Sequence, residues 1–365
     1  MWQVIGQDKL LALLDRSLKQ HSIAHSYLLL GPSHIGKRTL ALNLAQAVNC
    51  DDPQPPCGHC SSCLRIIEAK HPDVTILTLD SRREVEPGAD DTQKARQKVK
   101  IGTASIEDLQ HLANLPPYEG HYKVFIIENA ENMSTAAANR LLKILEEPPP
   151  RVIWLLLSAE EARLLPTVTS RCQRLELKPV PLQTIQEMLT ASYGIEDEKA
   201  TLLARLSNGC PGWALSALAD SELLQQRSQK VERLSSLLDA GLETRFALAE
   251  ELAVQFGHDR MAVIDTMAIW LSWWRDLMLI KGRCKKAIIN VDYERELEEQ
   301  AGSLSLRKIE DFITALRSTR ENIARNVNAR LAFESLMLNL PARSDGSSEG
   351  SDSQSNRNYG KYTAT

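Results

Sequence analysis

The stretch Gly31-Pro32-Ser33-His34-Ile35-Gly36-Lys37-Arg38-Thr39 decides how the first part of this chain is expected to fold. It follows the apolar run 27–30 and leads into residues 39–48, whose apolar positions have helical spacing. A buried strand, a glycine-bounded turn and a helix form the context of a phosphate-binding P-loop, where backbone N–H groups converge on one anion. A glycine turn that binds nothing would show the same pattern, so both interpretations stay open.

The loop departs from the P-loop pattern G-x-x-x-x-G-K-[ST] at its last position. Gly31, Gly36 and Lys37 match the pattern, and Lys37 would place a positive charge near the outer phosphates of a nucleotide. Arg38 stands where active nucleotide-hydrolysing proteins have the hydroxyl residue that holds Mg²⁺. Thr39 lies about 100° further around the helix and is a poor substitute. The loop is therefore predicted to hold ATP or ADP weakly or not at all.

Composition disfavours several classes of protein. The chain has 365 residues, which is enough for two or three domains with a large core. Its net charge of −4 argues against strong unaided binding to DNA, which normally requires a basic face. We find no run of about 20 apolar residues and no signal-peptide pattern, so neither a membrane span nor export is expected. These features predict a cytoplasmic protein.

Residues up to about 177 have the pattern of an α/β domain. Short apolar segments alternate with helical stretches, and five of them are predicted strands: 27–30, 74–79, 124–127, 152–157 and 174–177. This alternation predicts a parallel sheet covered by helices, with ligands at the carboxyl ends of the strands. The polar run 81–100 is interpreted as a solvated loop, and a nucleic-acid contact through its basic residues is the alternative.

Cysteine spacing predicts a metal site. The pattern C-x₆-C-x₂-C-x₂-C is formed by four residues: Cys50, Cys57, Cys60 and Cys63. Four thiolates this close together suit a closed, tetrahedral Zn²⁺ site with no position for a catalytic water. His59 is a conceivable competing ligand, and an iron–sulfur cluster or four free thiols are the alternatives. The zinc module, residues 50–63, is therefore predicted to be structural or to form a docking surface.

A second nucleotide-related motif follows the predicted strand 124–127. In hydrolysing P-loop proteins such a strand ends in Asp-Glu, where Asp supports Mg²⁺ and Glu polarises the attacking water. Here those positions hold Glu128 and Asn129. An amide is not basic near neutral pH, so Asn129 cannot act as a general base. Glu131 is charged, but two residues further on we expect it to point elsewhere.

Three further motifs carry a resemblance to a known family. The runs N-R-L-L-K-I-L-E-E-P-P (139–149) and S-R-C (170–172) resemble the clamp-loader branch of the AAA+ family. The segment V-I-G-Q (4–7) resembles the adenine-side element at the start of those proteins. Ser134 is expected to cap the helix that carries the first run, and Pro148 is expected to end it.

The resemblance implies roles for particular residues. Ser158, at the end of the fourth predicted strand, matches the sensor 1 position of the family. The segment 209–215 matches the sensor 2 region, where active members carry an arginine at the position of Gly212. Arg171 matches the arginine that acts in trans, as a finger on the nucleotide of a neighbouring subunit. A surface arginine in a local salt bridge is the alternative for Arg171.

Departures from the family pattern at Arg38, Asn129 and Gly212 indicate a subunit that does not itself turn over ATP. The resemblance therefore implies the non-motor subunit of the bacterial DNA polymerase III clamp loader, whose nucleotidyltransferase activity belongs to the complex. Implied partners are the gamma/tau and delta subunits in a ring, the sliding clamp, and primer–template DNA reached through the complex. A gamma/tau-like AAA+ ATPase motor and a zinc-dependent DNA-binding module are the alternatives.

The resemblance also predicts the domain limits. A nucleotide-binding-like domain at 1–178 is followed by a helical lid at 179–221 and a helical collar for oligomerisation at 222–340. The tail 341–365 is polar and expected to be disordered.

Within the predicted collar, several large apolar side chains share one helical face: Met267, Trp270, Trp274, Leu277 and Met278. We expect this face to lie in a core or a subunit contact, and base stacking on the tryptophans is the alternative. The segment 326–334 resembles the last helix of the family's collar.

Overall fold

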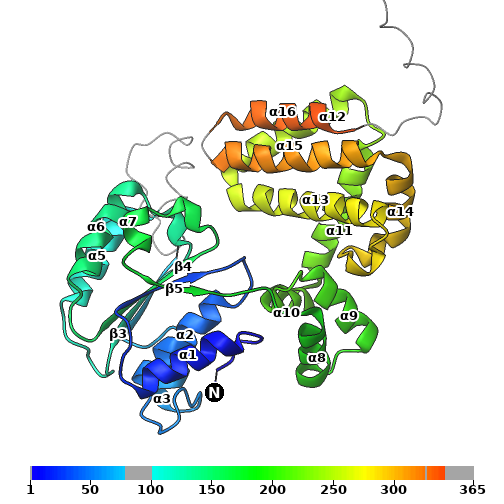
Figure 1. Cartoon of the computed structure of the whole chain (residues 1–365). Helices are drawn as coiled ribbons and strands as arrows, with labels where there is room; N and C mark the ends of the chain where they lie inside the picture. Colours follow the sequence, from blue (N-terminus) through cyan, green and yellow to red (C-terminus); the bar gives the residue numbers. More distant parts are fainter. Residues whose placement is uncertain (1, 79–100, 325–326, 342–365) are drawn as a thin grey trace, which may run out of the picture. The chain divides into compact units, whose positions relative to one another are not determined.

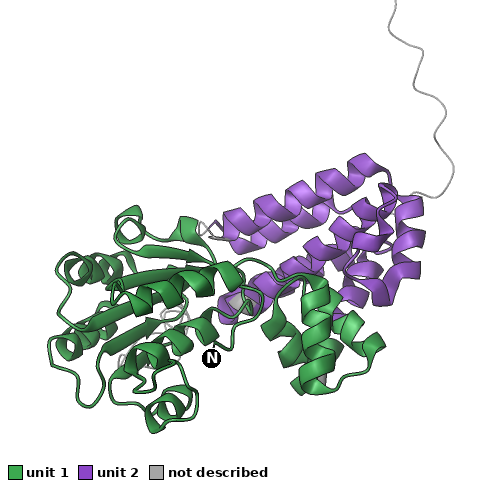
Figure 2. Ribbon diagram, turned by 60° about the horizontal axis from the view of Figure 1, so that its bottom comes forward, with its two compact units in different colours: residues 1–225 green, residues 226–365 purple. Residues whose placement is uncertain are grey.

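The computed structural model describes three stretches of the chain: residues 2–78, 101–324 and 327–341. By their internal contacts, the residues divide into unit 1 (1–225) and unit 2 (226–365), which Figure 2 colours separately. The polar run 81–100 and the tail beyond Pro341 lie outside the described residues. The finer division of the chain into a sheet domain, a lid and a collar stays a prediction.

Unit 1 contains a five-stranded parallel sheet, in the order β2-β3-β4-β1-β5 (Figure 1). The strands are β1 (Ser26–Leu30), β2 (Val74–Leu77), β3 (Lys123–Ile127), β4 (Val152–Ser158) and β5 (Gln173–Glu176). The three central strands are buried throughout, because their continuous apolar runs are covered on both faces. The predicted parallel α/β architecture is confirmed.

Helices cover the two faces of this sheet. They are α1 (Asp8–Lys19), α2 (Lys37–Asn49), α3 (Ser61–Ile67), α5 (Thr103–Ala113), α6 (Thr135–Glu146) and α7 (Pro166–Thr169), with short 3₁₀ turns at Ala130–Asn132 and Glu161–Arg163. Successive side chains of β1 point to opposite faces: Leu28 packs in the cluster with α5 and α6, and Leu29 packs in the cluster with α1 and α2. As predicted, Ser134 caps α6 by accepting a hydrogen bond from the N–H of Ala137 at 3.1 Å.

Three more helices of unit 1 share a separate hydrophobic core. They are α8 (Leu182–Tyr193), α9 (Asp197–Leu206) and α10 (Pro211–Ala219). The segment leading to α8 is held by Gln7, whose side chain donates to the carbonyl of Lys178 at 2.7 Å and accepts from its N–H at 3.1 Å. Gly6, with φ of 69°, packs so closely on Val180 that a Cβ would lie 2.7 Å from its Cγ1. The N-terminal segment therefore lies against the start of the α8–α10 helices.

Unit 2 is helical throughout its described residues. Its elements are α11 (Ser221–Leu237, which begins in unit 1), α12 (Leu242–His258), α13 (Arg260–Lys281), α14 (Glu294–Ser303), α15 (Leu306–Ala324) and α16 (Ala329–Asn339), with 3₁₀ turns at Lys285–Ala287 and Val291–Tyr293. Trp270 and Trp274 are buried in its core, which excludes base stacking on them. No helix among the described residues is both long and apolar enough to cross a membrane.

Candidate functional site: the two ends of helix α2

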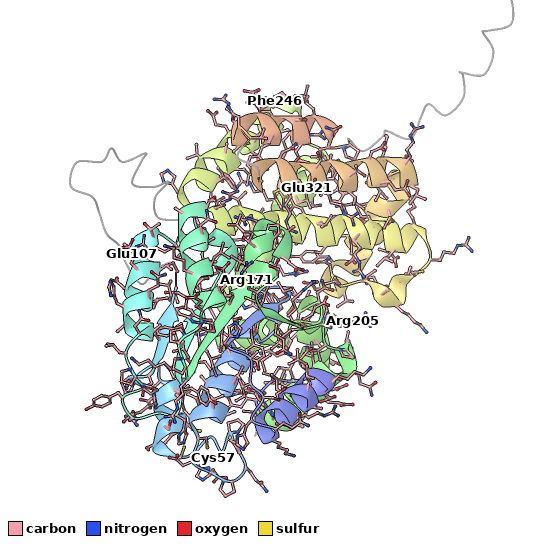
Figure 3. All side chains as sticks on the ribbon, turned by 60° about the vertical axis from the view of Figure 1, so that its left-hand side comes forward. Cys57, Glu107, Arg171, Arg205, Phe246 and Glu321 are labelled. Atoms are coloured by element: carbon pink, nitrogen blue, oxygen red, sulfur yellow. The ribbon has the colours of Figure 1, made fainter. Side chains whose placement is uncertain are left out.

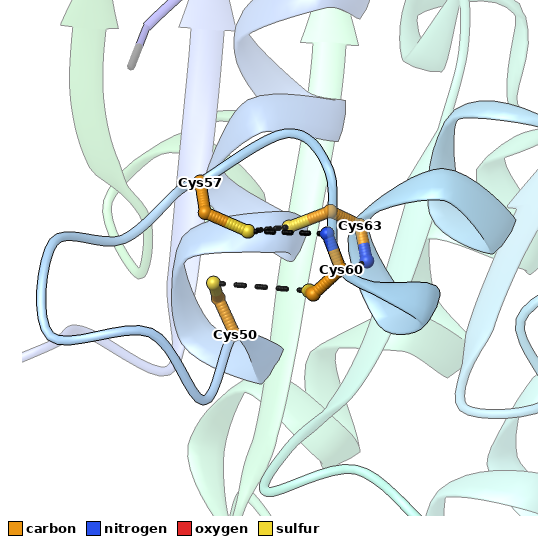
Figure 4. Close-up of side chains that lie close together, drawn as sticks. All are labelled: Cys50, Cys57, Cys60 and Cys63. Carbon is orange, nitrogen blue, oxygen red and sulfur yellow. Dashed lines mark hydrogen bonds between the residues drawn. The ribbon is translucent and has the colours of Figure 1, made fainter.

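The four cysteines of the predicted zinc module come together at the carboxyl end of α2 (Figure 4). Their sulfur atoms all lie within 4.8 Å of one another. The Sγ atoms of Cys50 and Cys60 are 4.0 Å apart, and those of Cys57 and Cys63 are 3.8 Å apart. A tetrahedral Zn²⁺ with Zn–S bonds of about 2.3 Å would separate its sulfur ligands by about 3.8 Å. The predicted four-cysteine cluster is confirmed, and it fits a zinc ion.

Backbone donors around the cluster favour thiolates on some of these cysteines. The N–H groups of Cys60 and Cys63 lie 3.3 and 3.4 Å from the sulfurs of Cys57 and Cys60. Hydrogen bonding, first from the N–H of His59, lowers the pKa of Cys57 to about 6. Burial instead raises the pKa of Cys50 and Cys63, and a bound cation is the usual means of deprotonating such thiols.

His59 also lies near the cluster, as the alternative interpretation required. Its ligand atom is within 4.8 Å of one oxygen of Asp52 and of the sulfur of Cys57. That second group contains only one thiol, and its histidine is exposed, whereas the first group contains four thiols. The chemistry of zinc, which prefers thiolates in closed structural sites, favours the four-cysteine set.

Buried polar side chains fasten the module to the rest of unit 1. Gln46, on α2, donates to the carbonyl of Cys63 at 2.9 Å. The Ser62 hydroxyl is 3.1 Å from Nε2 of the buried His71. Outside the module, Asp73 orders the segment before β3 by accepting hydrogen bonds from the N–H groups of residues 118, 119 and 120 at 2.7–2.9 Å. The sequence analysis did not predict a structural role for these residues. The one available indication was that they are polar residues among apolar neighbours.

At the amino end of α2, the lysine of the P-loop forms hydrogen bonds with the backbone of that same loop. Gly31 and Gly36 have φ of 147° and 106°, conformations that favour glycine, so the loop bends tightly as predicted. The ammonium group of Lys37 donates to the carbonyls of Gly31 at 2.5 Å and Pro32 at 2.8 Å. Burial lowers the pKa of Lys37, and the negative charge of Glu131 acts against that shift. Lys37 thus binds the loop itself, and the orientation of Glu131 stays a prediction.

The two positions that would hold Mg²⁺ form an ion pair instead. Nε of Arg38 lies 3.1 Å from Oε1 of Glu128, whose side chain is 17% exposed. No hydrogen bond is aligned within this pair, so the contact is mainly electrostatic. Asn129 is exposed in a left-handed conformation, and Thr39 is half-buried. A permanently positive guanidinium therefore takes the place that a divalent cation would occupy beside this carboxylate.

The two positions that match the family's sensors, Gly212 and Ser158, also make contacts within the chain. The N–H of Gly212, at the start of α10, donates to the carbonyl of His34 in the P-loop at 2.9 Å. A Cβ on Gly212 would lie only 2.7 Å from that oxygen, so the arginine of active relatives has no room here. Ser158 is fully buried and paired in register with Leu30, and its hydroxyl accepts from the N–H of Glu160 at 3.2 Å.

Arg171 lies apart from the cysteine cluster, well separated from Cys57 in Figure 3. Its Nη2 atom is 2.7 Å from Oε1 of Glu146, and its Nη1 atom donates to the carbonyl of Thr167 at 3.0 Å. Its own carbonyl accepts from the hydroxyl of Ser26 at 2.7 Å. The predicted residues therefore form three groups: the zinc module, the closed P-loop, and Arg171 in the salt bridge that was the alternative for it.

Two family models match most of the chain. The model described as "DNA polymerase III, delta subunit" matches residues 6–181, and the model described as "DNA polymerase III, delta subunit, C terminal" matches residues 221–341.

Individual relatives agree with these models. The delta' subunit of DNA polymerase III from Bacillus subtilis is 27% identical over 335 residues, covering 92% of this chain and 96% of the relative. The delta' subunit from Pseudomonas aeruginosa is 34% identical over 219 residues, covering 59% of this chain and 62% of the relative. The tau subunit from Bacillus subtilis is 27% identical over 355 residues, and the match spans 93% of this chain but 54% of that protein.

A solved structure related to the DNA polymerase III gamma subunit, from Thermotoga maritima, is 18% identical with a TM-score of 0.42. The match covers 91% of this chain and 99% of that one.

The fold and site define a P-loop protein in which the phosphate-binding lysine and the metal positions are bound by other groups of the same chain. The chain belongs to the family of DNA polymerase III clamp-loader subunits that includes the delta' and gamma/tau proteins.

Proposed function

We propose that this chain is a delta'-type, non-motor subunit of the DNA polymerase III clamp loader. The observation that carries the proposal is the closed P-loop: Lys37 binds loop carbonyls, Arg38 pairs with Glu128, and Gly212 packs on His34. The metal ligand, the base and the sensor arginine act together in phosphoryl transfer, so their combined loss favours a subunit without ATPase activity.

In this proposal the chain works within a ring that contains gamma/tau and delta subunits. The ring loads the sliding clamp on primer–template DNA during replication in the cytoplasm, and the motor subunits supply the ATP hydrolysis. The near full-length match to a delta' protein supports this role more than the match to about half of a tau protein does. Zinc would be structural, held by the four cysteines and linking the end of α2 to α3.

Arg171 is proposed to act on the ATP of a neighbouring subunit. It lies two residues before β5, at the amino ends of the strands, whereas the P-loop follows the carboxyl end of β1. A five-residue strand at about 3.3 Å per residue separates these ends by about 16 Å, so Arg171 does not serve its own P-loop. Its guanidinium is half-exposed and permanently charged, and its planar donors match phosphate oxygens.

The test replaces Arg171 in the assembled complex. In a loader reconstituted with cognate gamma/tau and delta subunits, Arg171→Ala should leave assembly intact and lower DNA-stimulated ATPase activity and clamp loading. Fingers in other systems contribute about 10³–10⁵ in rate, but several sites share the work in a ring, so we expect a smaller loss. Unchanged activity would remove the finger role.

A gamma/tau-like motor is the competing function, and the isolated chain tests it. Our proposal predicts no ATP turnover by the purified chain. Turnover at a motor-like rate that Lys37→Ala abolishes would assign the chain to the motor class.

A further inference from the structure

The carboxylate of Glu146 is the one charged group recorded beside the Arg171 guanidinium among the described residues. Glu146 is the last residue of α6, and Arg171 follows α7, so the contact joins the ends of two helices on one side of the sheet. The distance between Nη2 and Oε1 is 2.7 Å, with the two side chains 36% and 50% exposed. The pair is therefore accessible from solvent and from a neighbouring subunit.

The backbone of Arg171 is fixed independently of Glu146. Its carbonyl accepts from the buried Ser26 at 2.7 Å, and its N–H donates to the carbonyl of Val168 at 3.1 Å. The arginine side chain has several rotatable bonds, so holding its guanidinium in one orientation costs conformational entropy. What orients the guanidinium is its contacts with Thr167 and Glu146.

These contacts leave donors available on the guanidinium. The two N–H groups of Nη1 face the carbonyl of Thr167 at 3.0 Å and the hydroxyl of Ser170 at 3.4 Å. Nη2 lies 2.7 Å from Oε1 of Glu146 in an ion pair. Among the described residues, no hydrogen bond is recorded from the Nε–H or from Nη2, and a phosphate can accept from both nitrogens.

The position of Glu146 is unfavourable for a carboxylate by itself. The carboxyl end of a helix carries partial negative charge and favours cations over anions. Arg171 offsets this repulsion, so the helix end, the carboxylate and the arginine form one electrostatic unit.

We propose that Glu146 is a positioning residue for the arginine finger: it holds the Arg171 guanidinium in the orientation that presents its free N–H groups to the phosphates of a neighbouring subunit's ATP. This inference rests on the proposed finger function of Arg171. It concerns a residue that touches no nucleotide and acts only through Arg171.

The experiment compares variants of this chain in the loader reconstituted with cognate gamma/tau and delta subunits. Glu146→Ala removes the carboxylate of the ion pair, and Glu146→Gln keeps a side-chain oxygen of similar reach without the charge. Glu147→Ala is the matched control, because Glu147 is an adjacent exposed carboxylate with no ion pair recorded in the described residues. Thermal unfolding and size-exclusion chromatography establish that each variant folds and assembles.

We expect Glu146→Ala to lower kcat of the DNA-stimulated ATPase about two- to five-fold, the range that an exposed ion pair can contribute. The KM for ATP should stay unchanged, because nucleotide binding belongs to the neighbour. Glu146→Gln should recover only part of kcat, because it keeps the side-chain oxygen but not the charge of the ion pair, and Glu147→Ala should match the unmodified chain. In an Arg171→Ala background, Glu146→Ala should have no further effect.

The possible results of this experiment separate the positioning role of Glu146 from the finger function of Arg171. If Arg171→Ala lowers activity while Glu146→Ala leaves it unchanged or raises it, the positioning role is wrong and the finger stands. If Glu146→Ala lowers activity equally in the Arg171→Ala background, Glu146 acts through the fold and the positioning role is again wrong. If Arg171→Ala itself has no effect, the proposed finger function fails, and the inference fails with it.

Discussion

Helix α2 has a candidate ligand site at each end, and the two sites differ in how far the chain satisfies them by itself. At the carboxyl end, four thiols converge with the spacing of a tetrahedral metal site. At the amino end, Lys37 donates to loop carbonyls and Arg38 pairs with Glu128. Lys37 and Arg38 satisfy oxygen acceptors at the amino end, whereas among the described residues no lysine or arginine is recorded beside the four sulfurs. The amino end of α2 is satisfied because the chain itself supplies positive charge there, whereas the four sulfurs at the carboxyl end need a bound cation.

The largest expected effect is at the cysteine end. We expect one Zn²⁺ per chain by elemental analysis, and we expect a chelator or Cys57→Ser to lower the unfolding temperature of unit 1 strongly. Structural zinc binding is linked to folding, with apparent free energies of about 10–16 kcal/mol in small zinc domains, so its loss should cost several kcal/mol. Cys284→Ser, at an exposed cysteine outside the cluster, is the control. Protein purified without stoichiometric zinc, or with iron, would contradict this prediction.

An intermediate effect is expected where α10 closes the P-loop. Gly212→Ala places a methyl group 2.7 Å from the carbonyl oxygen of His34, and overpacking of this kind costs about 1–3 kcal/mol. Gly257→Ala provides the matched control, because a Cβ on this helical glycine meets nothing within 4 Å and should stabilise the chain by about 0.4–1 kcal/mol. Chemical denaturation measures both. Equal effects of the two substitutions would show that α10 does not press on the loop.

The smallest effect is expected for the ion pair at the metal position. Arg38 is 59% exposed, so its pairing with Glu128 should contribute about 0.2–1 kcal/mol in a double-mutant cycle with Arg38→Ala and Glu128→Ala. The coupling should weaken at high salt, because solvent ions screen exposed charges. A coupling of zero at low salt would mean that the pair does not help to close the site.

Local patterns in the sequence predicted much of the fold. The strands, the bends at Gly31 and Gly36, and the Ser134 cap depend on residues close together in the chain, so their spacing is sufficient to predict them. The cysteine cluster could be predicted for the same reason, since three of its four members lie within seven residues. One helical interpretation needed the structure: the tryptophan face proved to be core.

The sequence by itself determined the strand–loop–helix order, the metal-ligand spacing and the departures from the P-loop pattern at Arg38, Asn129 and Gly212. Only the tertiary structure decided what replaced the missing groups. Arg38 meets Glu128 because α2 and the end of β3 lie side by side, and Gly212 meets His34 because α10 packs on the loop. Such contacts join residues that are distant in the chain, so no local spacing encodes them; they follow from how the burial of apolar surface brings whole elements together.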